Sequence, residues 1–278
     1  MEQTMKKSIP IKPFWYSDVI VLPKLVTIIT TLNKQGTINA APYSLFSPHD
    51  VMTAKPQVMV GMRKFSHTYK NILATGEFVV NFPSADYLDD IMETSRFYPE
   101  GVNELENTKF TPIPSQQVKV PSIKECNQHI ECRLHEHFEI DKTQAKVIGN
   151  IAAIVVDDDL LTVGRGERIK KLNMPIYMGD EKRKYFYYGR VNTTEMIELK
   201  APPKKEGKEE EEVVTKLPWE SGALLLLNEI PSIVRTMVAE MAEDIVQKEG
   251  LTKVTHERFI KLMEEYAPKD VMGRIEKD

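Results

Sequence analysis

Short runs of β-branched residues, separated by polar turns, recur along the first 200 residues and constrain the fold more than any other feature of the chain. They lie at residues 25–31, 57–62, 77–82, 129–140 and 146–156, and an aromatic run follows at residues 185–188. Such runs are typical of strands, whereas helical signals cover only residues 66–74, 84–97 and 167–172. Many short strands with few helices predict a mainly β (α+β) barrel with flanking helices rather than a doubly wound sheet.

A charged segment at residues 200–216 divides the chain. It begins with two prolines among lysines and continues into four consecutive glutamates, Glu209–Glu212. Such a segment cannot bury enough apolar surface to offset the entropy that it loses on ordering. We therefore expect a barrel domain over residues 1–199, a flexible linker over residues 200–216 and a small all-α domain over residues 217–278.

Composition excludes several classes of protein. The 278 residues carry a net charge of −4 and no basic stripe with interleaved aromatics, so nucleic acid is not an expected partner. The longest apolar runs, Ile151–Val156 and Ala223–Leu227, are far shorter than the about 20 residues that a membrane span requires. The N-terminal residues lack the apolar core of a signal peptide, and two cysteines, Cys126 and Cys132, are too few for a disulfide scaffold. We expect a cytoplasmic protein that does not associate with membranes.

Six small or polar residues come after the first predicted strand and its turn: Asn39, Ala40, Ala41, Pro42, Tyr43 and Ser44. Backbone groups that cannot swing away best match the pyrimidine edge of a flat polar ring, and small residues allow the chain to approach closely. Asn39 and Ser44 add side-chain hydrogen bonds, and Tyr43 could form a wall. The alternative interpretation is a strand end followed by a proline-kinked loop, with Tyr43 in the core.

A cationic, hydroxyl-bearing segment follows the second predicted strand. Arg63, Lys64, Ser66 and Thr68 place two cations and two hydroxyls at the start of a predicted helix. Cations, hydroxyls and helix N-termini are the groups that best bind a phosphate. With the ring site, this segment predicts a flavin mononucleotide (FMN) site, and His67 could contact FMN or a nicotinamide nucleotide. The alternatives are that Ser66 only caps the helix, that the cations lie in a solvated turn and that His67 faces solvent.

Residues 18–195 resemble the flavin reductase-like family of FMN-binding split barrels. Four motifs carry the resemblance in the family's order: Asn39–Ser44, Thr68-x-x-Asn71-Ile72, Thr75–Asn81, and Glu125-Cys126 with Glu131–Leu134. The resemblance implies a six-stranded Greek-key barrel, a homodimer with FMN near the subunit interface, and Asn71 and Tyr177 as neighbours of the flavin. It also implies that NADH or NADPH passes hydride to the flavin, which carries the chemistry itself, so no residue is predicted to be catalytic.

A metal site is not predicted. His129, Glu131, His135 and His137 share parity on one predicted strand, so we expect them on one face. The same strand alternates apolar and polar residues as a half-buried strand should, and no second cluster supplies further ligands. Cys126 and Cys132 are interpreted as small buried residues.

The C-terminal residues 217–266 resemble the small helical domain that ends the B subunit of light-independent protochlorophyllide reductase. The resemblance rests on Leu217–Glu220, Ile230-Pro231-x-x-Val234-Arg235, Gly250 and Val254-Thr255. We expect three helices, in which Pro231 starts one helix, Gly250 ends it and Thr255 caps the next. Two cysteines cannot form a four-cysteine cluster site, so the resemblance implies only docking onto a redox partner or covering of the flavin cleft.

Three functions are compatible with these features. The first is an NAD(P)H-dependent reductase that passes electrons through FMN to free flavin, ferric iron or a redox partner. The others are a flavoredoxin-like electron carrier and a non-catalytic FMN-binding protein whose helical domain recruits partners. An enzyme like pyridoxamine phosphate oxidase would share the fold, but the Asn39–Ser44 pattern fits the reductase branch better.

Overall fold

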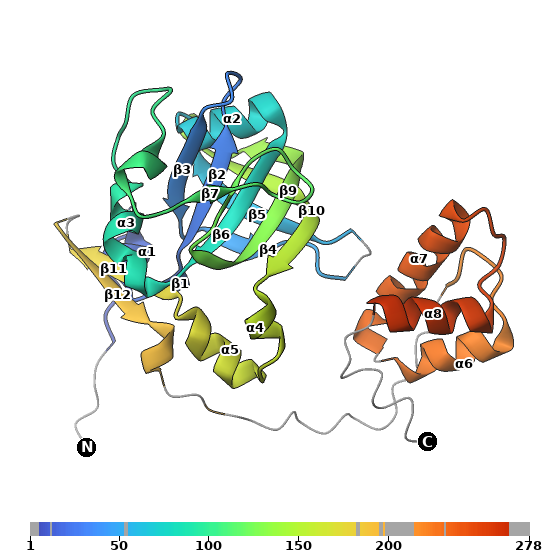
Figure 1. Cartoon of the computed structure of the whole chain (residues 1–278). Helices are drawn as coiled ribbons and strands as arrows, with labels where there is room; N and C mark the ends of the chain where they lie inside the picture. The colour runs from blue at the N-terminus through green and yellow to red at the C-terminus, as the bar shows by residue number, and fades with distance from the viewer. Residues whose placement is uncertain are drawn as a thin grey trace, which may run out of the picture. The chain divides into compact units, whose positions relative to one another are not determined.

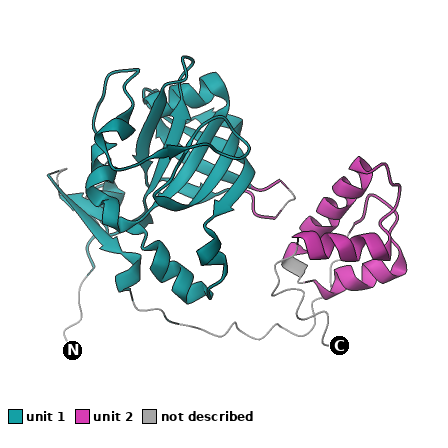
Figure 2. Ribbon diagram, in the orientation of Figure 1, with its two compact units in different colours: residues 1–49, 57–198 teal, residues 50–56, 199–278 magenta. Residues whose placement is uncertain are grey.

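The computed structural model describes residues 6–11, 13–52, 55–181, 184–194, 197, 214–230 and 232–266. The chain forms two compact units, one from residues 1–49 and 57–198 and the other from residues 50–56 and 199–278 (Figure 2). Of the expected linker, residues 200–213 lie outside the described residues, as does Pro231. No described helix is long and apolar enough to cross a membrane.

The first unit is built around one curled antiparallel sheet with the strand order β3-β2-β6-β9-β10-β5-β4 (Figure 1). Its strands are β2 (Thr27–Leu32), β3 (Ile38–Tyr43), β4 (Phe46–Pro48), β5 (Gln57–Arg63), β6 (Glu77–Pro83), β9 (Cys126–Glu139) and β10 (Gln144–Val156). The predicted split-barrel fold is confirmed. The sheet has seven strands among the described residues instead of six, because the short segment β4 pairs with the outer side of β5.

The main core lies inside the curl of this sheet. β5 alternates between buried and half-buried residues, so that Val58, Val60 and Met62 face inward. The helix α2 (His67–Thr75) adds Tyr69 and Ile72 to the same cluster. Each large apolar side chain buried in this way stabilises the fold by roughly 1.5–3 kcal/mol relative to exposure. The core therefore holds α2 firmly against the sheet.

β9 contains a β-bulge that the sequence pattern did not reveal. Ile148 pairs with Glu136 and Gly149 pairs with Leu134, which leaves His135 as an extra residue in β9. The prediction that His129, Glu131, His135 and His137 share one face is wrong, because the bulge reverses the alternation between Leu134 and Glu136. No three His, Cys, Asp or Glu residues of the described chain are grouped as metal ligands.

Short elements complete the first unit. One small sheet contains β1 (Lys24–Leu25), β11 (Pro175–Glu181) and β12 (Tyr185–Arg190). Another contains β7 (Pro112–Ile113) and β8 (Ser122–Ile123). The helices are α1 (Trp15–Asp18), η1 (Ala85–Tyr87), α3 (Leu88–Glu93), η2 (Glu104–Asn107), α4 (Asp158–Leu161), α5 (Arg165–Leu172) and η3 (Val191–Thr193). The predicted helix over residues 84–97 ends early. The hydroxyls of Thr94 and Ser95 donate back to the carbonyls of Ile91 and Met92, which competes with further helical turns.

The second unit contains three described helices, α6 (Ser221–Glu229), α7 (Ser232–Lys248) and α8 (His256–Tyr266), so the predicted C-terminal helices are present. Gly250, with φ 75°, follows the end of α7, and the Thr255 hydroxyl accepts from the amide of Arg258 at 3.2 Å. Trp219 packs against Phe259 with ring centroids 5.0 Å apart. The unit thus has a hydrophobic core of its own.

Candidate flavin site

The N-terminus of α2 presents unused backbone donors. The Ser66 hydroxyl caps this helix, since it accepts from the amide of Tyr69 at 3.2 Å and donates to the carbonyl of Arg63 at 2.8 Å. The amides of His67 and Thr68 precede the first residue that can bond within the helix, so they have no intrahelical acceptor. Ser66 is therefore the N-cap of α2. The amides of His67 and Thr68 and the helix dipole can still bind an anion.

The two cations of the predicted phosphate segment have different surroundings. Lys64 Nζ pairs with Glu139 Oε2 at 2.5 Å, and the side chain of Lys64 is 23% exposed. Arg63 is exposed and forms no ion pair among the described residues, while its guanidinium lies 5.9 Å from the centre of the Phe65 ring. Arg63 is therefore the cation of this segment that is available to a phosphate.

The predicted ring-binding residues lie in β3, which is the edge strand of the sheet. The amide of Ala40 points away from β2 and donates to Glu104 Oε2 at 2.9 Å. Alternate residues of a strand direct their amides to the same side, so the next outward position is Pro42, which has no N–H. A proline-kinked loop is thus wrong for this segment, because Pro42 pairs within β3 at the sheet edge. Ser44 is the first of the predicted residues beyond the strand.

Side chains of β3 and α2 form a hydrogen-bonded chain. With the Asn39 amide nitrogen facing Glu104, it donates to Oε1 at 3.2 Å, and the Asn39 oxygen accepts from Thr68 Oγ1 at 3.0 Å. Burial raises the pKa of Tyr43, and the neighbouring hydroxyls of Thr68 and Ser66 oppose this rise. The structure therefore joins Asn39 to Thr68 by a side-chain hydrogen bond and places Ser66 and Thr68 near the Tyr43 hydroxyl.

Thr68 is 1% exposed, so its side chain is available to neighbouring residues rather than to solvent. Its contribution to an anion site is the backbone amide at the N-terminus of α2. Ala40 is fully buried and packs in the core, and Ala41 is half-buried.

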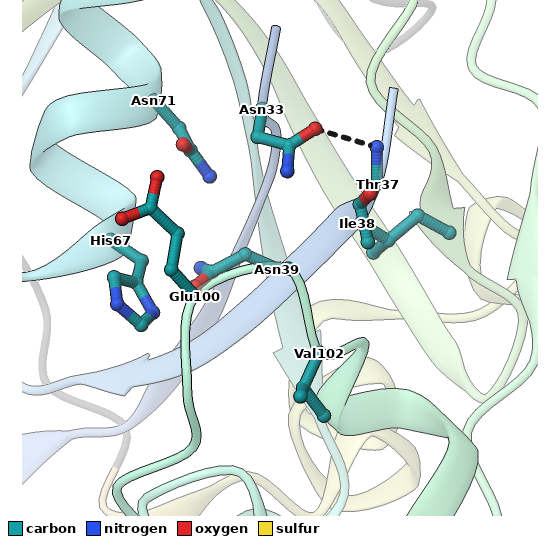
Figure 3. A pocket seen from close by; sticks show the side chains of 9 residues that line it. Asn33, Thr37, Ile38, Asn39, His67, Asn71, Glu100 and Val102 are labelled. Atoms are coloured by element: carbon teal, nitrogen blue, oxygen red, sulfur yellow. Dashed lines mark hydrogen bonds between the residues drawn. The ribbon is translucent and has the colours of Figure 1, made fainter. Parts of the chain in front are cut away.

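His67 and Asn71 line a cavity between α2 and the β2–β3 hairpin, together with Asn39, Glu100 and Val102 (Figure 3). Its volume of about 10 Å³ corresponds to a single water, so it is not the flavin pocket. Asn71 Nδ2 donates to Thr31 Oγ1 at 3.1 Å, which joins α2 to β2. A larger depression of about 340 Å³ adjoins the cavity and is lined by Asn33, Lys34, Gln35, Lys70, Asn71, Ala74 and Glu100.

Tyr177 belongs to a different group of side chains. It lies in β11, where its hydroxyl donates to Asp180 Oδ2 at 2.7 Å and its ring lies 5.7 Å from that of Tyr188. Burial and the Asp180 carboxylate both raise the pKa of Tyr177. Within the described part of the chain, no hydrogen bond or ring contact joins Tyr177 to the residues at α2.

Glu104 was not among the sequence-predicted residues. It lies in η2, is 5% exposed and bonds to a strand 64 positions earlier in the chain. No motif surrounds it, and a glutamate between Asn103 and Leu105 is ordinarily exposed. Only the tertiary structure reveals its place beside Asn39.

The donors at α2 fit the phosphate end of a flavin nucleotide. A flavin mononucleotide phosphate carries nearly two negative charges, and Arg63, two free amides and the helix dipole lie within one turn. A guanidinium with backbone amides is a strong combination for a phosphate because the hydrogen bonds are charge-assisted. Beyond β3, the half-buried Ser44 carries a backbone amide and a hydroxyl.

Comparison with known proteins identifies a family and several similar proteins. Residues 21–172 match the family model of the flavin reductase-like domain. An uncharacterised protein of Methanothermobacter thermautotrophicus is 34% identical over 168 residues, which cover 59% of this chain and 77% of that protein. Component B of nitrilotriacetate monooxygenase from Bacillus cereus has a TM-score of 0.60 and 25% identity, covering 70% of this chain and all of that one.

Flavoredoxin of Desulfovibrio vulgaris (Miyazaki F) shares the fold, with a TM-score of 0.56, 22% identity and coverage of 73% of this chain and 100% of its own. The family match ends at residue 172 and so does not include residues 199–278 of the second unit. The resemblance of the C-terminal helices to a protochlorophyllide reductase domain therefore stays a prediction. Because the family model covers more than half of the sequence, the chain belongs to the flavin reductase-like domain family and is a flavin-related oxidoreductase.

Proposed function

We propose that this protein binds FMN and passes electrons from NADH or NADPH through it to free flavin, ferric iron or a redox partner. The observation that carries the proposal is the N-terminus of α2, where Arg63 and the amides of His67 and Thr68 offer a positive site for a phosphate. Bound FMN would supply hydride acceptance and electron transfer. The side chains of this unit bind and orient the cofactor.

Each part of the site has a role in the proposal. Arg63 neutralises phosphate charge, and the two α2 amides fix the phosphate position. Ser44 donates to the polar edge of the ring, while Tyr43, held by Thr68 and Ser66, limits movement beside the ring. Tyr177 enters as a neighbour of the flavin by family resemblance. Neither Lys64, which is paired with Glu139, nor the buried Asn71 is assigned a direct contact.

We also propose that the protein is a homodimer. Large apolar side chains remain exposed on α1, β1, β11 and β12, including Trp15, Leu25, Met178 and Phe186. These elements contact one another within the first unit. An exposed apolar surface of this kind marks an interaction site, and a second copy could complete a flavin site that one chain leaves open. The cytoplasmic location and a redox partner for the C-terminal helices stay predictions.

The test is a visible absorption spectrum of the protein with FMN, followed by anaerobic addition of NADH or NADPH. Flavin bands shifted by binding and then bleached by either nucleotide would support the reductase. Bound flavin that neither nucleotide bleaches, but that a reduced protein donor does, would favour the electron carrier. Unshifted bands and no change in flavin fluorescence would contradict FMN binding.

A further inference from the structure

Glu104 occupies the outer edge of β3, where a further strand would otherwise pair. Its Oε2 accepts the amide of Ala40 at 2.9 Å, and the residue is 5% exposed. A buried N–H requires an acceptor, and Pro42 removes the next outward donor from the edge. Glu104 therefore satisfies an outward-facing amide of β3 and fixes the position of this strand relative to η2.

The same carboxylate reaches the predicted cofactor residues through Asn39. Oε1 accepts from the Asn39 amide nitrogen at 3.2 Å, which directs the Asn39 oxygen toward Thr68 at 3.0 Å. The Thr68 hydroxyl then donates to Asn39 and has lone pairs for the Tyr43 hydroxyl. A carboxylate is acceptor-only, so its ionised form directs the Asn39 nitrogen toward Glu104 and leaves the Asn39 oxygen to accept from the Thr68 hydroxyl.

A glutamine in the same place would reverse that direction. Its amide nitrogen would donate to the Asn39 oxygen, and Asn39 would turn its nitrogen toward Thr68. The Thr68 hydroxyl would then accept from Asn39 and donate to Tyr43. The packing would be nearly unchanged while the proton of the Tyr43 hydroxyl would point elsewhere.

The free energy of folding does not by itself favour the charge. Burying an ionised carboxylate is unfavourable unless its bonds compensate, and burial raises the pKa of Glu104 although the Ala40 amide and the charge of His67 oppose the rise. His67 on α2 and Tyr43 on β3 are the titratable groups that interact with it from the neighbouring elements. A buried charge that folding does not require suggests a role in the site.

We propose that Glu104 is a positioning residue of the flavin site, which holds β3 through Ala40 and orients the Tyr43 hydroxyl through Asn39 and Thr68. The inference rests on the FMN site proposed above. Glu104 touches neither phosphate nor ring in this scheme, and its effect is transmitted by the hydrogen-bonded chain.

The first experiment measures the FMN dissociation constant of the full-length wild type, Glu104→Gln and Glu106→Gln by flavin fluorescence. Glu106 is an exposed glutamate on the same short helix and serves as the matched control. We expect the FMN dissociation constant to rise about tenfold in Glu104→Gln and to change less than twofold in Glu106→Gln. The melting temperature of Glu104→Gln should equal or exceed that of the wild type near pH 7.

Two further measurements separate positioning from a general structural role. In a Thr68→Val background, Glu104→Gln should weaken FMN binding by less than twofold, because the chain through Thr68 is already cut. As the pH falls toward the raised pKa of Glu104, the affinity of the wild type should approach that of Glu104→Gln, because the carboxylate takes up a proton. The FMN phosphate titrates in the presence of either protein, so the difference between the two profiles reports Glu104.

Each outcome decides the inference. Equal FMN affinity of wild type and Glu104→Gln would overturn it and leave the proposed function intact. An additive effect in the Thr68→Val background, or loss of a cooperative melt in Glu104→Gln, would also overturn it. A wild-type protein that does not bind FMN would overturn the proposed function itself, and the inference with it.

Discussion

At the scale of single residues, the free guanidinium of Arg63 distinguishes the phosphate site from an ordinary capped helix. Lys64 is paired with Glu139, whereas Arg63 forms no ion pair in the described part of the chain. Exposed ion pairs contribute only about 0–1 kcal/mol, so a bound phosphate could also draw Lys64 away from Glu139. The primary electrostatic contribution should nevertheless come from Arg63.

We predict that Arg63→Ala weakens FMN binding by roughly tenfold to a hundredfold, because a hydrogen bond to a charged group contributes about 1.5–3 kcal/mol. The matched control is Arg165→Ala, which removes an exposed arginine at the start of α5. Fluorescence titration with FMN measures both variants. If both variants lost the same FMN affinity, the loss would reflect the net charge of the protein, and Arg63 would not belong to the phosphate site.

His129 provides a second residue-scale prediction, on stability. It is 5% exposed, and its Nδ1 lies 3.1 Å from Asn81 Oδ1, which already accepts the amide of Ile123. An amide oxygen can only accept, so Nδ1 donates to it. Burial lowers the pKa of His129, although the charges of Asp157 and Glu131 oppose this.

Because the pKa of His129 is lower in the folded chain, the unfolded chain binds a proton at this residue more readily as the pH falls below about 6.5. The stabilising contribution of neutral His129 is present above this pH and is lost as the pH falls toward the lowered pKa. We predict that the free energy of unfolding decreases less between pH 7 and about pH 5.5 in His129→Asn than in the wild type. Urea unfolding at both pH values measures the slopes, and equal slopes would contradict the prediction.

At the scale of elements, the bulge in β9 lies opposite a glycine that the packing requires. A Cβ on Gly149 of β10 would lie 2.5 Å from Phe78 Cζ and 3.1 Å from Cys132 Cβ. Phe78 is fully buried and cannot move without disturbing the core. The close approach of β10 to this ring thus depends on the absence of a side chain at residue 149.

We predict that Gly149→Ala lowers the free energy of unfolding by about 1–3 kcal/mol through overpacking. Gly189→Ala in β12 is the control, since its nearest neighbour, Ile176 Cβ, lies at an ordinary 3.8 Å. Urea unfolding curves give both values. The account fails if the two variants lose the same stability.

At the scale of the whole molecule, each of the two units has a hydrophobic core among its described residues. In the first unit, Val60, Phe78 and Val147 belong to the core under α2, and in the second unit, Leu227, Val246 and Phe259 form another. The second unit also buries Glu243, which accepts from the indole N–H of Trp219 at 2.9 Å. Each unit therefore contains the burial that independent folding requires.

We predict that residues 214–278 fold alone, and that residues 1–199 alone retain FMN binding within about threefold of the full chain. Far-ultraviolet circular dichroism of the 214–278 fragment should show helix and a cooperative melt. Titration of the 1–199 fragment with FMN tests whether the binding site lies within these residues. A non-cooperative melt of the 214–278 fragment, or loss of FMN binding in the 1–199 fragment, would show that the units depend on each other.

Local signals predicted much of the fold and part of the site. The β-branched runs located β2, β5, β6, β9 and β10, because side-chain alternation and burial are properties of a short segment. The start of α2 at Ser66 followed from cap chemistry for the same reason. Local signals do not identify Asn39–Tyr43 as a strand, because its small residues and proline have little strand propensity. Its pairing with β2 decides its conformation.

The sequence by itself determined the class of fold, the cationic turn before α2 and the C-terminal helices, because these depend on neighbouring residues. The tertiary structure alone decided that Lys64 is paired with a residue 75 positions away and that Glu104 supports β3 across 64 positions. It also decided that His135 is the extra residue of a bulge where β9 pairs with β10. Such contacts depend on strand register and on which groups are buried together, and no short segment of sequence contains that information.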